Sequence, residues 1–339
     1  MTTVRLGIDI AKNIFQLHGV DAQEQTTLRK RVKRDKLLHE LSKLPPCLIG
    51  MEACASSHYW ARTIKALGHE VKLMAAHFVC PYRKNEKNDG NDAEAICEAV
   101  GRPTMRFVNI KTVDQQAIIT LHRVRSLLVS ERTALVNQIR GTLAEYGLVM
   151  PSGIDRLRNM LPDILEDAEN ALCTLVRAVV AEQRERLQLF DERIRDYDRQ
   201  IQNLANANEA ARRLCTIEGV GALTATAIVA SIGDGNTFRN GRQFAAWLGL
   251  VPRQRSSGNK QRLGRITKRG DIYLRMLLIH GARSVLRVTA TRTDRKSRWA
   301  EQLKARCGYN KAAVALAAKQ ARIIWAVLSR GEAYQPAAV

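Results

Sequence analysis

Apolar and polar residues alternate with a period of two at the start of the chain. In VRLGIDI the apolar side chains fall on one face: Val4, Leu6, Ile8 and Ile10. Gly7 and Asp9 fall on the other face, as expected of a half-buried strand. NIFQLHGVD and QTTLRKRV have the composition of two further strands of a meander. Helical and strand-like segments then alternate, so residues 4–108 predict three strands, helix, strand, helix, strand and helix.

The middle of the chain changes to helical periodicity. A first stripe in residues 112–147 consists of Leu121, Val124, Leu128, Leu135, Ile139 and Leu143. A second, in residues 187–204, repeats at alternating steps of three and four, like the a/d seam of a coiled coil: Leu187, Phe190, Ile194, Tyr197, Ile201 and Leu204. Two long helices packed within one monomer and an arm that joins two protomers explain these stripes equally well.

From about residue 208 two apolar helical segments flank a Gly-x-Gly turn, Gly219 and Gly221. The turn resembles a helix-hairpin-helix, whose backbone amides approach a DNA phosphate, although plain helical hairpins contain similar turns. The chain closes with an alanine-rich helical segment. The fold class we predict is α/β plus all-α, with an α/β domain at 1–110, a helical coiled-coil region at 111–207 and a mostly helical domain at 208–332.

The net charge of the chain indicates what kind of partner it binds. The net charge is +21 with a pI near 10.1, which is typical of a protein that binds a polyanion, most often nucleic acid. Residues 201–339 hold 24 Lys and Arg against 7 Asp and Glu, which is +17 of the total. The seven cysteines form no C-x-x-C pair, no run approaches the length of a membrane span, and the N-terminus has no apolar signal region. These features predict a cytoplasmic protein without a membrane partner.

Four carboxylates in the first hundred residues are candidates for chemistry. Asp9 lies within a strand, opposite its apolar row, and Glu52 ends the strand CLIGME. Asp89 and Asp92 lie three apart where a helix begins. Each acid alone is explained as a helix cap or an ion-pair partner. An acid within a buried strand needs compensation, and a divalent cation with oxygen ligands such as Mg²⁺ would provide it.

The most basic stretch contains two adjacent serines, Ser256 and Ser257, followed by Gly258. From Arg239 to Arg275 ten basic side chains stand against one acid, Asp271. By themselves these residues are explained as a solvated turn against nucleic acid.

Two sets of motifs resemble one known family. GIDIAK, GMEACASS and KNDGNDAEAI are similar to the DEDD motifs of the RuvC-like, RNase H-fold domain in insertion-sequence transposase family 110, and KND is closest to its 1111 branch. GLVPRQRSSGNKQRLGRITKRGDIYLR is similar to the C-terminal transposase domain of that family. The motifs lie at both ends of the chain and in the order found in the family.

The resemblance implies a composite active site. Asp9, Glu52, Asp89 and Asp92 would bind Mg²⁺, for which Mn²⁺ can substitute, and Ser257 would attack DNA to form a phosphoserine, with Ser256 as the reserve candidate. The residues that we expect to contact nucleic acid are Arg253, Arg255, Lys260, Arg262, Arg265, Lys268, Arg269, Arg275, Gly219 and Gly221.

The resemblance also implies a set of partners. They are donor and target double-stranded DNA, a structured bridge RNA encoded by the element, and further copies of the chain in dimers and tetramers, in a bacterial cytoplasm at the nucleoid. Two other functions stay open. One is a RuvC-like nuclease or resolvase of branched DNA that uses metal-activated water and no serine. The other is a nucleic-acid-binding protein whose acids are structural.

Overall fold

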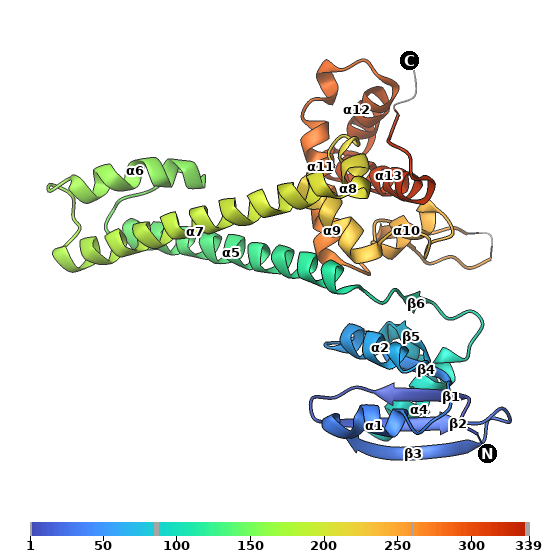
Figure 1. Cartoon of the computed structure of the whole chain (residues 1–339). Helices are drawn as coiled ribbons and strands as arrows, with labels where there is room; N and C mark the ends of the chain where they lie inside the picture. The colour runs from blue at the N-terminus through green and yellow to red at the C-terminus, as the bar shows by residue number, and fades with distance from the viewer. Residues whose placement is uncertain (1, 85–87, 259, 336–339) are drawn as a thin grey trace. The chain divides into compact units, whose positions relative to one another are not determined.

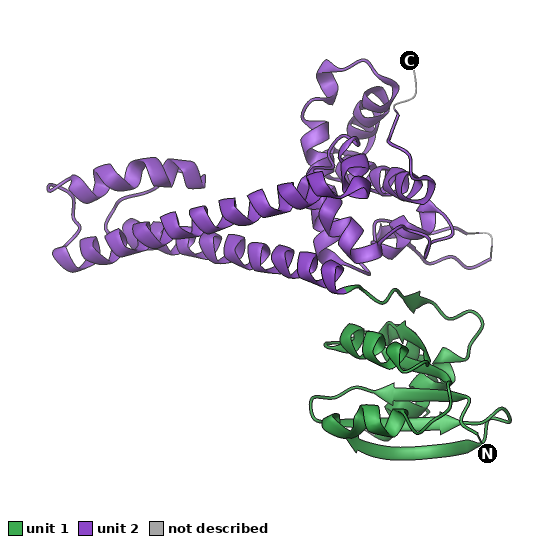
Figure 2. Ribbon diagram, viewed as in Figure 1, with its two compact units in different colours: residues 1–112 green, residues 113–339 purple. Residues whose placement is uncertain are grey.

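The computed structural model describes residues 2–84, 88–258 and 260–335. The chain divides into two compact units, residues 1–112 (unit 1) and 113–339 (unit 2) (Figure 2). The alanine-rich segment and the long helical stripes fall in unit 2, and the four candidate acids fall in unit 1.

Unit 1 is a mixed α/β fold. Its strands are β1 (Arg5–Asp9), β2 (Ile14–Val20), β3 (Thr26–Lys33), β4 (Leu48–Glu52), β5 (Glu70–Met74) and β6 (Phe107–Val108). Its helices are η1 (Arg34–Lys36), α1 (Leu37–Leu41), α2 (Ser57–Ala66), α3 (Ala76–Val79), η2 (Cys80–Tyr82) and α4 (Asp89–Val100). The strands form one sheet in the order β3-β2-β1-β4-β5-β6 (Figure 1).

The sheet is antiparallel across β1, β2 and β3 and parallel across β1, β4 and β5. The predicted order of strands and helices is confirmed, with α3, η2 and β6 in addition. The predicted strand at the start was too long, because Val4 lies outside β1 and is exposed. The mixed sheet is compatible with an RNase H-like domain.

The two faces of this sheet carry different residues. Leu6, Ile8 and Ile49 are completely buried in a core that also contains α1 and α2 residues such as Leu37 and Trp60. The opposite face packs on α4 through a second, smaller core. Since side chains alternate along a strand, Asp9 and Glu52 belong to the face that α4 covers.

Unit 2 is helical apart from one hairpin. Its helices are α5 (Val113–Ala144), α6 (Ile154–Glu166), α7 (Thr174–Ala207), α8 (Glu209–Cys215), α9 (Ala222–Ile232), α10 (Gly241–Trp247), α11 (Ile272–Leu286), η3 (Thr289–Thr291), α12 (Arg295–Cys307) and α13 (Tyr309–Arg330). The hairpin strands are β7 (Pro252–Gln254) and β8 (Leu263–Ile266).

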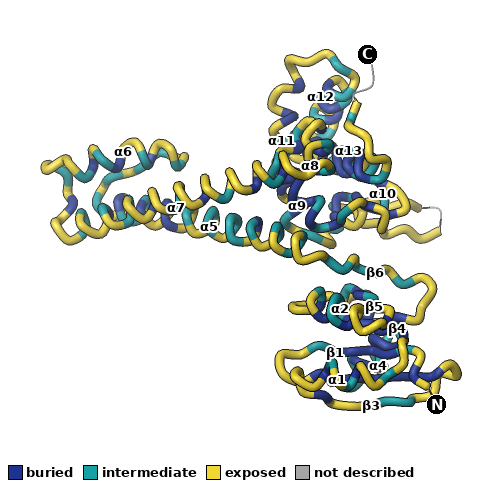
Figure 3. The backbone as a smooth tube through the Cα atoms, viewed as in Figure 1, coloured by how far each residue is buried: buried dark blue, intermediate teal, exposed yellow. Residues whose placement is uncertain are grey.

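The helices α5, α6 and α7 form an arm, residues 113–207. Along α7 the buried residues recur every seven positions: Val180, Leu187, Ile194 and Ile201. Arg132 of α5 contacts Asp191 of α7 at 2.8 Å and Arg125 contacts Asp198, so the two helices run antiparallel within one chain. The two long helices therefore pack against each other within one chain, where they bury their apolar seam (Figure 3).

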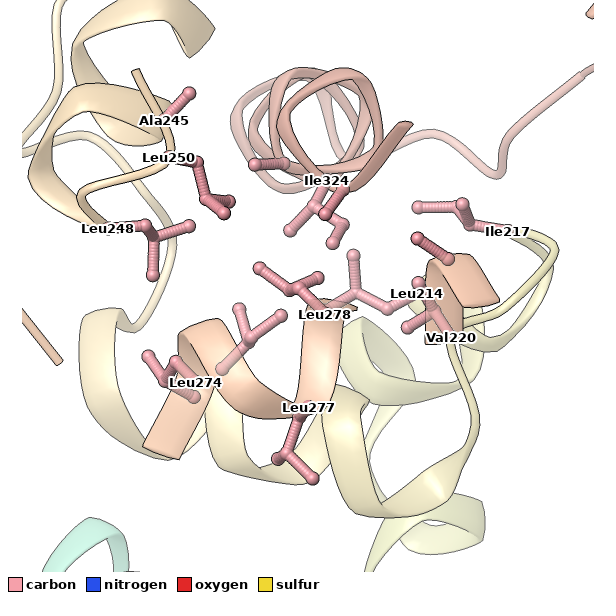
Figure 4. Close-up of a cluster of buried hydrophobic side chains, with 14 of the residues drawn as sticks. Leu214, Ile217, Val220, Ala245, Leu248, Leu250, Leu274, Leu277, Leu278 and Ile324 are labelled. Atoms are coloured by element: carbon pink, nitrogen blue, oxygen red, sulfur yellow. The ribbon is translucent and has the colours of Figure 1, made fainter. Parts of the chain in front are cut away.

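The C-terminal body, residues 208–335, packs α8 to α13 around one apolar core. Its side chains include Leu214, Leu248, Leu278 and Ile324, from four different segments (Figure 4). By length and composition, helix α13 is long and apolar enough to cross a membrane, contrary to the prediction that no run approaches that length. Half of its apolar window is buried within the protein, as for a core helix.

Candidate active site

Neighbouring strands bring two acids to the same end of the sheet. In the parallel pair of β1 and β4, Gly7 lies opposite Gly50 and Ile8 opposite Met51, so Asp9 and Glu52 come next in register. Asp92 from α4 joins them, because all three line one cavity of about 470 Å³. Three of the four sequence-predicted acids therefore meet in one place.

A glycine in β1 allows α4 to lie directly on the sheet. A Cβ atom at Gly7 would lie 2.2 Å from the carbonyl oxygen of Ala93 and 2.4 Å from the amide nitrogen of Cys97. Helix α4 begins after Asn88, whose side chain accepts a hydrogen bond of 2.9 Å from the amide of Asn91. Asn88 is thus the N-cap, a role that sequence reasoning considered for Asp89 and Asp92. The characteristic spacing was visible in NDGN, because an N-cap side chain bonds the amide three residues on.

Two neighbouring groups, Arg83 and Cys54, interact with the carboxylates that line this cavity. The Arg83 guanidinium lies 3.3 Å from a carboxylate oxygen of Asp92. The pKa of the Cys54 thiol is raised, first by burial and then by the negative charges of Glu52 and Asp9. The negative potential of the two strand-end acids therefore reaches the loop that follows β4.

The donor chemistry fits a divalent cation with oxygen ligands, since carboxylates from two strands and one helix line a single cavity. Among the described residues no three His, Cys, Asp or Glu side chains are close enough together to hold an ion. Arg83 pairs with Asp92 in this arrangement. The side chain of Asp89, the fourth predicted acid, lies outside what the structure describes.

The serines lie at the tip of the β7–β8 hairpin in unit 2. The amide of Lys260 donates to the carbonyl of Ser257 at 3.2 Å, closing a turn in which Gly258 takes φ +55°. Glycine suits that conformation because it has no Cβ. The described residues of the two strands and the tip are exposed, except the half-buried Ile266. The turn therefore presents Ser257 to solvent.

The two serines differ in their bonding. The Ser256 hydroxyl lies 3.0 Å from Nε2 of Gln254 and accepts a hydrogen bond of 3.3 Å from the amide of Arg262. No hydrogen bond from the described residues engages the Ser257 hydroxyl. Ser256 therefore bonds within the hairpin, whereas Ser257 makes no such side-chain bond to the described residues.

The root of the hairpin is fixed to the body. A Cβ at Gly249 would lie 2.2 Å from the carbonyl oxygen of Arg269, and one at Gly270 would lie 1.9 Å from that of Trp247. Arg275 Nη1 donates to the carbonyls of Leu248 at 3.0 Å and Arg269 at 3.1 Å. The two root segments are thus clamped together below an exposed tip.

The position of Arg275 argues against its predicted contact with nucleic acid. Arg275 is 8% exposed, so its guanidinium serves the protein interior and is not presented to a phosphate. Gly219 also has a packing role, because a Cβ there would lie 2.6 Å from the carbonyl oxygen of Gly281 in α11. Gly221, by contrast, directly precedes α9, and a Cβ atom there would have no neighbour within 4 Å. The other predicted basic contacts are all exposed: Arg253, Arg255, Lys260, Arg262, Arg265, Lys268 and Arg269.

Comparison with known proteins places these two halves in one family. A family model described as "Transposase IS116/IS110/IS902 family" matches residues 211–297, and a DEDD transposase model of the IS110 type matches residues 6–148. A probable family 20 transposase of Pseudomonas aeruginosa is 49% identical over 99% of this chain and 100% of its own length. The chain belongs to the IS116/IS110/IS902 transposase family.

Other relatives are transposases by their names as well. The transposase for insertion sequence element IS1111A of Coxiella burnetii is 46% identical over 97% of this chain and 91% of its own length. A putative transposase of Sinorhizobium fredii is 42% identical over 98% of this chain and 86% of its own length. Similarity therefore extends over both units and the arm.

The transposase family assigns a broad role to each matched region. The DEDD match contains all four predicted acids, and this type of domain implies dependence on a divalent metal. The second match contains the serine hairpin and the Gly219–Gly221 turn. As a transposase of an insertion sequence, the chain acts on DNA, and the family suggests cleavage and rejoining of strands.

Proposed function

We propose that this transposase cuts and rejoins DNA with Ser257 as nucleophile and with carboxylate-bound Mg²⁺ as its cofactor. The observation that carries the proposal is the exposed Ser257 at the tip of a basic hairpin with a fixed root. Such a hairpin presents a hydroxyl to a phosphodiester while its cations neutralise the surrounding phosphates.

In the proposed step the Ser257 oxygen forms a bond to phosphorus. The phosphorus–oxygen bond to one deoxyribose breaks, and that strand end leaves as a hydroxyl carrying the proton that the serine gives up. Rejoining reverses these changes with the hydroxyl of a different strand end. The phosphodiester energy is kept in the phosphoserine, so no external energy source is needed.

The acids supply the second half of the site. Asp9, Glu52 and Asp92, with Asp89, would hold Mg²⁺, and Mn²⁺ would substitute for it. The bound ion would stabilise negative charge on the reacting phosphate. Arg83, which pairs with Asp92, would lose this partner if the carboxylate bound the ion.

The finer family properties complete the proposal. A structured RNA from the element would pair with donor and target DNA, so the protein itself would contact mainly phosphates. The chain would act as a dimer and tetramer in the bacterial cytoplasm at the nucleoid, and its similarity to the IS1111A transposase supports the 1111 branch. Acids of unit 1 in one protomer would serve a serine of unit 2 in another.

A denaturing gel tests the nucleophile. Purified protein is incubated with end-labelled donor and target DNA, Mg²⁺ and the RNA from the element's flank. We expect a DNA-linked protein band that Ser257→Ala and Asp9→Asn both abolish. Ser256→Ala is the companion variant: it removes the neighbouring hydroxyl and its bonds within the hairpin, so it should weaken the linked band without abolishing it. Cleavage without a linked band, unchanged by Ser257→Ala, would instead support the metal-dependent nuclease or resolvase that uses water.

Mixing two inactive variants tests the sharing of sites between protomers. If the acids and the serine of one site come from different chains, Asp9→Asn and Ser257→Ala together restore some intact sites. Each mixed site then takes its acids from the Ser257→Ala chain and its serine from the Asp9→Asn chain. Persistent inactivity of a co-refolded mixture would assign both halves of each site to one chain.

A further inference from the structure

An edge strand of unit 1 is a second basic surface, although most of the net charge lies in unit 2. From Arg29 to Lys36, six of eight residues are basic and one is acidic. They lie on β3 and η1, and β3 is the outermost strand of the sheet. Among the described residues only Lys30 of these six forms an ion pair, with Glu40 at 2.5 Å. The remaining cations are exposed and available to an anionic partner.

Aromatic rings lie at the end of this strand. Phe15 and Trp60 pack edge to face with ring centroids 5.2 Å apart, and Tyr59 packs on Trp60 at 5.1 Å. The Arg34 guanidinium lies over the Trp60 ring at 5.1 Å. Phe15 and Trp60 are buried, whereas Tyr59 is 50% exposed. The buried rings therefore hold the outer ring in place for a ligand.

Arg34, Tyr59 and Trp60 line a cavity of about 760 Å³, together with Asn13, Ile14, Lys33, Asp35 and Leu38. This volume lies in the range of about 300–1,000 Å³ that is common for small-molecule sites. The indole nitrogen of Trp60 is buried, and no described residue accepts its hydrogen bond. This N–H is thus a buried polar group without a partner, on a ring that also lines the cavity.

The cavity lies at the end of the sheet where the acids lie, but on the other face. Ile14 starts β2, directly after Asn13, and β2 begins where the antiparallel strand β1 ends at Asp9. Leu38 of α1 and Tyr59 of α2 form its wall, whereas α4 covers the acids. A strand that passes around this end of the sheet would meet both sites.

We propose that this cavity binds one unpaired nucleotide of a single-stranded nucleic acid. The base stacks on Tyr59, and Lys33, Arg34 and the exposed cations of β3 contact the flanking phosphates. Stacking on an exposed ring beside a basic strand suits single strands of any sequence, because every base has a flat face. A base within a duplex is already stacked on both sides and does not enter. The proposal is independent of the nucleophile in unit 2.

Photo-crosslinking reports this site despite the strong background of nucleic-acid binding expected from unit 2. The full-length protein is irradiated with oligothymidylate carrying one 5-iodouracil, and separately with the RNA equivalent, and the crosslinked peptides are identified by mass spectrometry. We expect a crosslink at Tyr59. Tyr59→Ala should lower the yield of crosslinked α2 peptides about tenfold, in line with the loss of one stacked base. Tyr59→Phe retains a ring and should keep the wild-type yield. Leu67→Ala is the matched control for an exposed apolar side chain after the same helix.

The salt dependence of affinity tests the phosphate contacts. The slope of log K against log salt is negative, and each lost contact to a single strand makes it shallower by about 0.7. We expect this change for Lys33→Ala and none for Lys65→Ala, an exposed lysine in α2. A crosslink with RNA alone or with DNA alone would identify the strand that the site takes. Crosslinks confined to the β7–β8 hairpin, with none in α2 for either oligonucleotide, would overturn the proposal.

Discussion

His122 joins the base of the arm to the C-terminal body through two hydrogen bonds. Thr226 of α9 donates its hydroxyl proton to the carbonyl of Ala222 at 2.7 Å, so its oxygen accepts from Nε2–H of His122 at 3.0 Å. Nδ1 of His122 then accepts from the hydroxyl of Tyr273 in α11, also at 3.0 Å. This arrangement is complete only for the neutral imidazole. A proton on Nδ1 would force the Tyr273 hydroxyl to reverse its role.

The structure gives the size of the resulting pH dependence. Burial, and secondarily the positive charge of Arg125, lower the pKa of His122 from 6.5 to about 4. The unfolded chain therefore binds a proton more tightly than the folded chain between these values. Stability from this group is complete above pH 6.5 and declines as the pH falls toward 4. At about 1.4 kcal/mol per tenfold change in proton affinity, the full loss is about 3 kcal/mol, of which about 2 kcal/mol is lost by pH 5.

Urea unfolding of the wild type and of His122→Gln at pH 7 and pH 5 measures this loss. Tryptophan fluorescence is a suitable probe, since Trp247, Trp299 and Trp325 lie in unit 2. We expect the wild type to lose about 2 kcal/mol more than His122→Gln on acidification. His280→Gln is the control, because His280 is an exposed histidine in the same unit. An equal loss in wild type and His122→Gln would refute the proposed role of the neutral imidazole.

Three further predictions concern the halves of the site. Gly7→Ala should displace α4, because the new methyl group meets the carbonyl of Ala93; we expect a loss of about 2–4 kcal/mol, and an unchanged melting temperature would contradict it. Arg275→Leu should remove the donor to the buried carbonyl of Leu248 and the partly buried carbonyl of Arg269 and cost about 1–3 kcal/mol, measured by urea unfolding; a loss of nucleic-acid affinity alone would show that Arg275 is a surface contact. Arg83→Gln should remove the cation that competes for Asp92 and tighten Mn²⁺ binding about two- to tenfold by calorimetry, whereas weaker binding would show that Arg83 supports the metal site.

Local patterns in the sequence were sufficient for much of the fold. Alternation and helical spacing depend on which side of a strand or helix faces a core, so they determined the α/β order of unit 1 and the long helices of the arm. The same alternation placed Asp9 opposite the apolar row of its strand, and the hairpin turn was marked by Ser257 and Gly258. The charge count alone indicated a polyanionic partner.

Contacts between distant segments were decided only by the tertiary structure. Nothing local distinguishes Arg275 from the exposed arginines around it, because its partners Leu248 and Arg269 are set by how α11 packs below the hairpin. Gly219 likewise owes its packing role to α11. Helix α5 pairs with α7 through contacts such as that of Arg132 with Asp191, which lie 59 residues apart in the chain. A periodic pattern states that a face is buried, but the partner that buries it is chosen by packing between elements far apart in the chain.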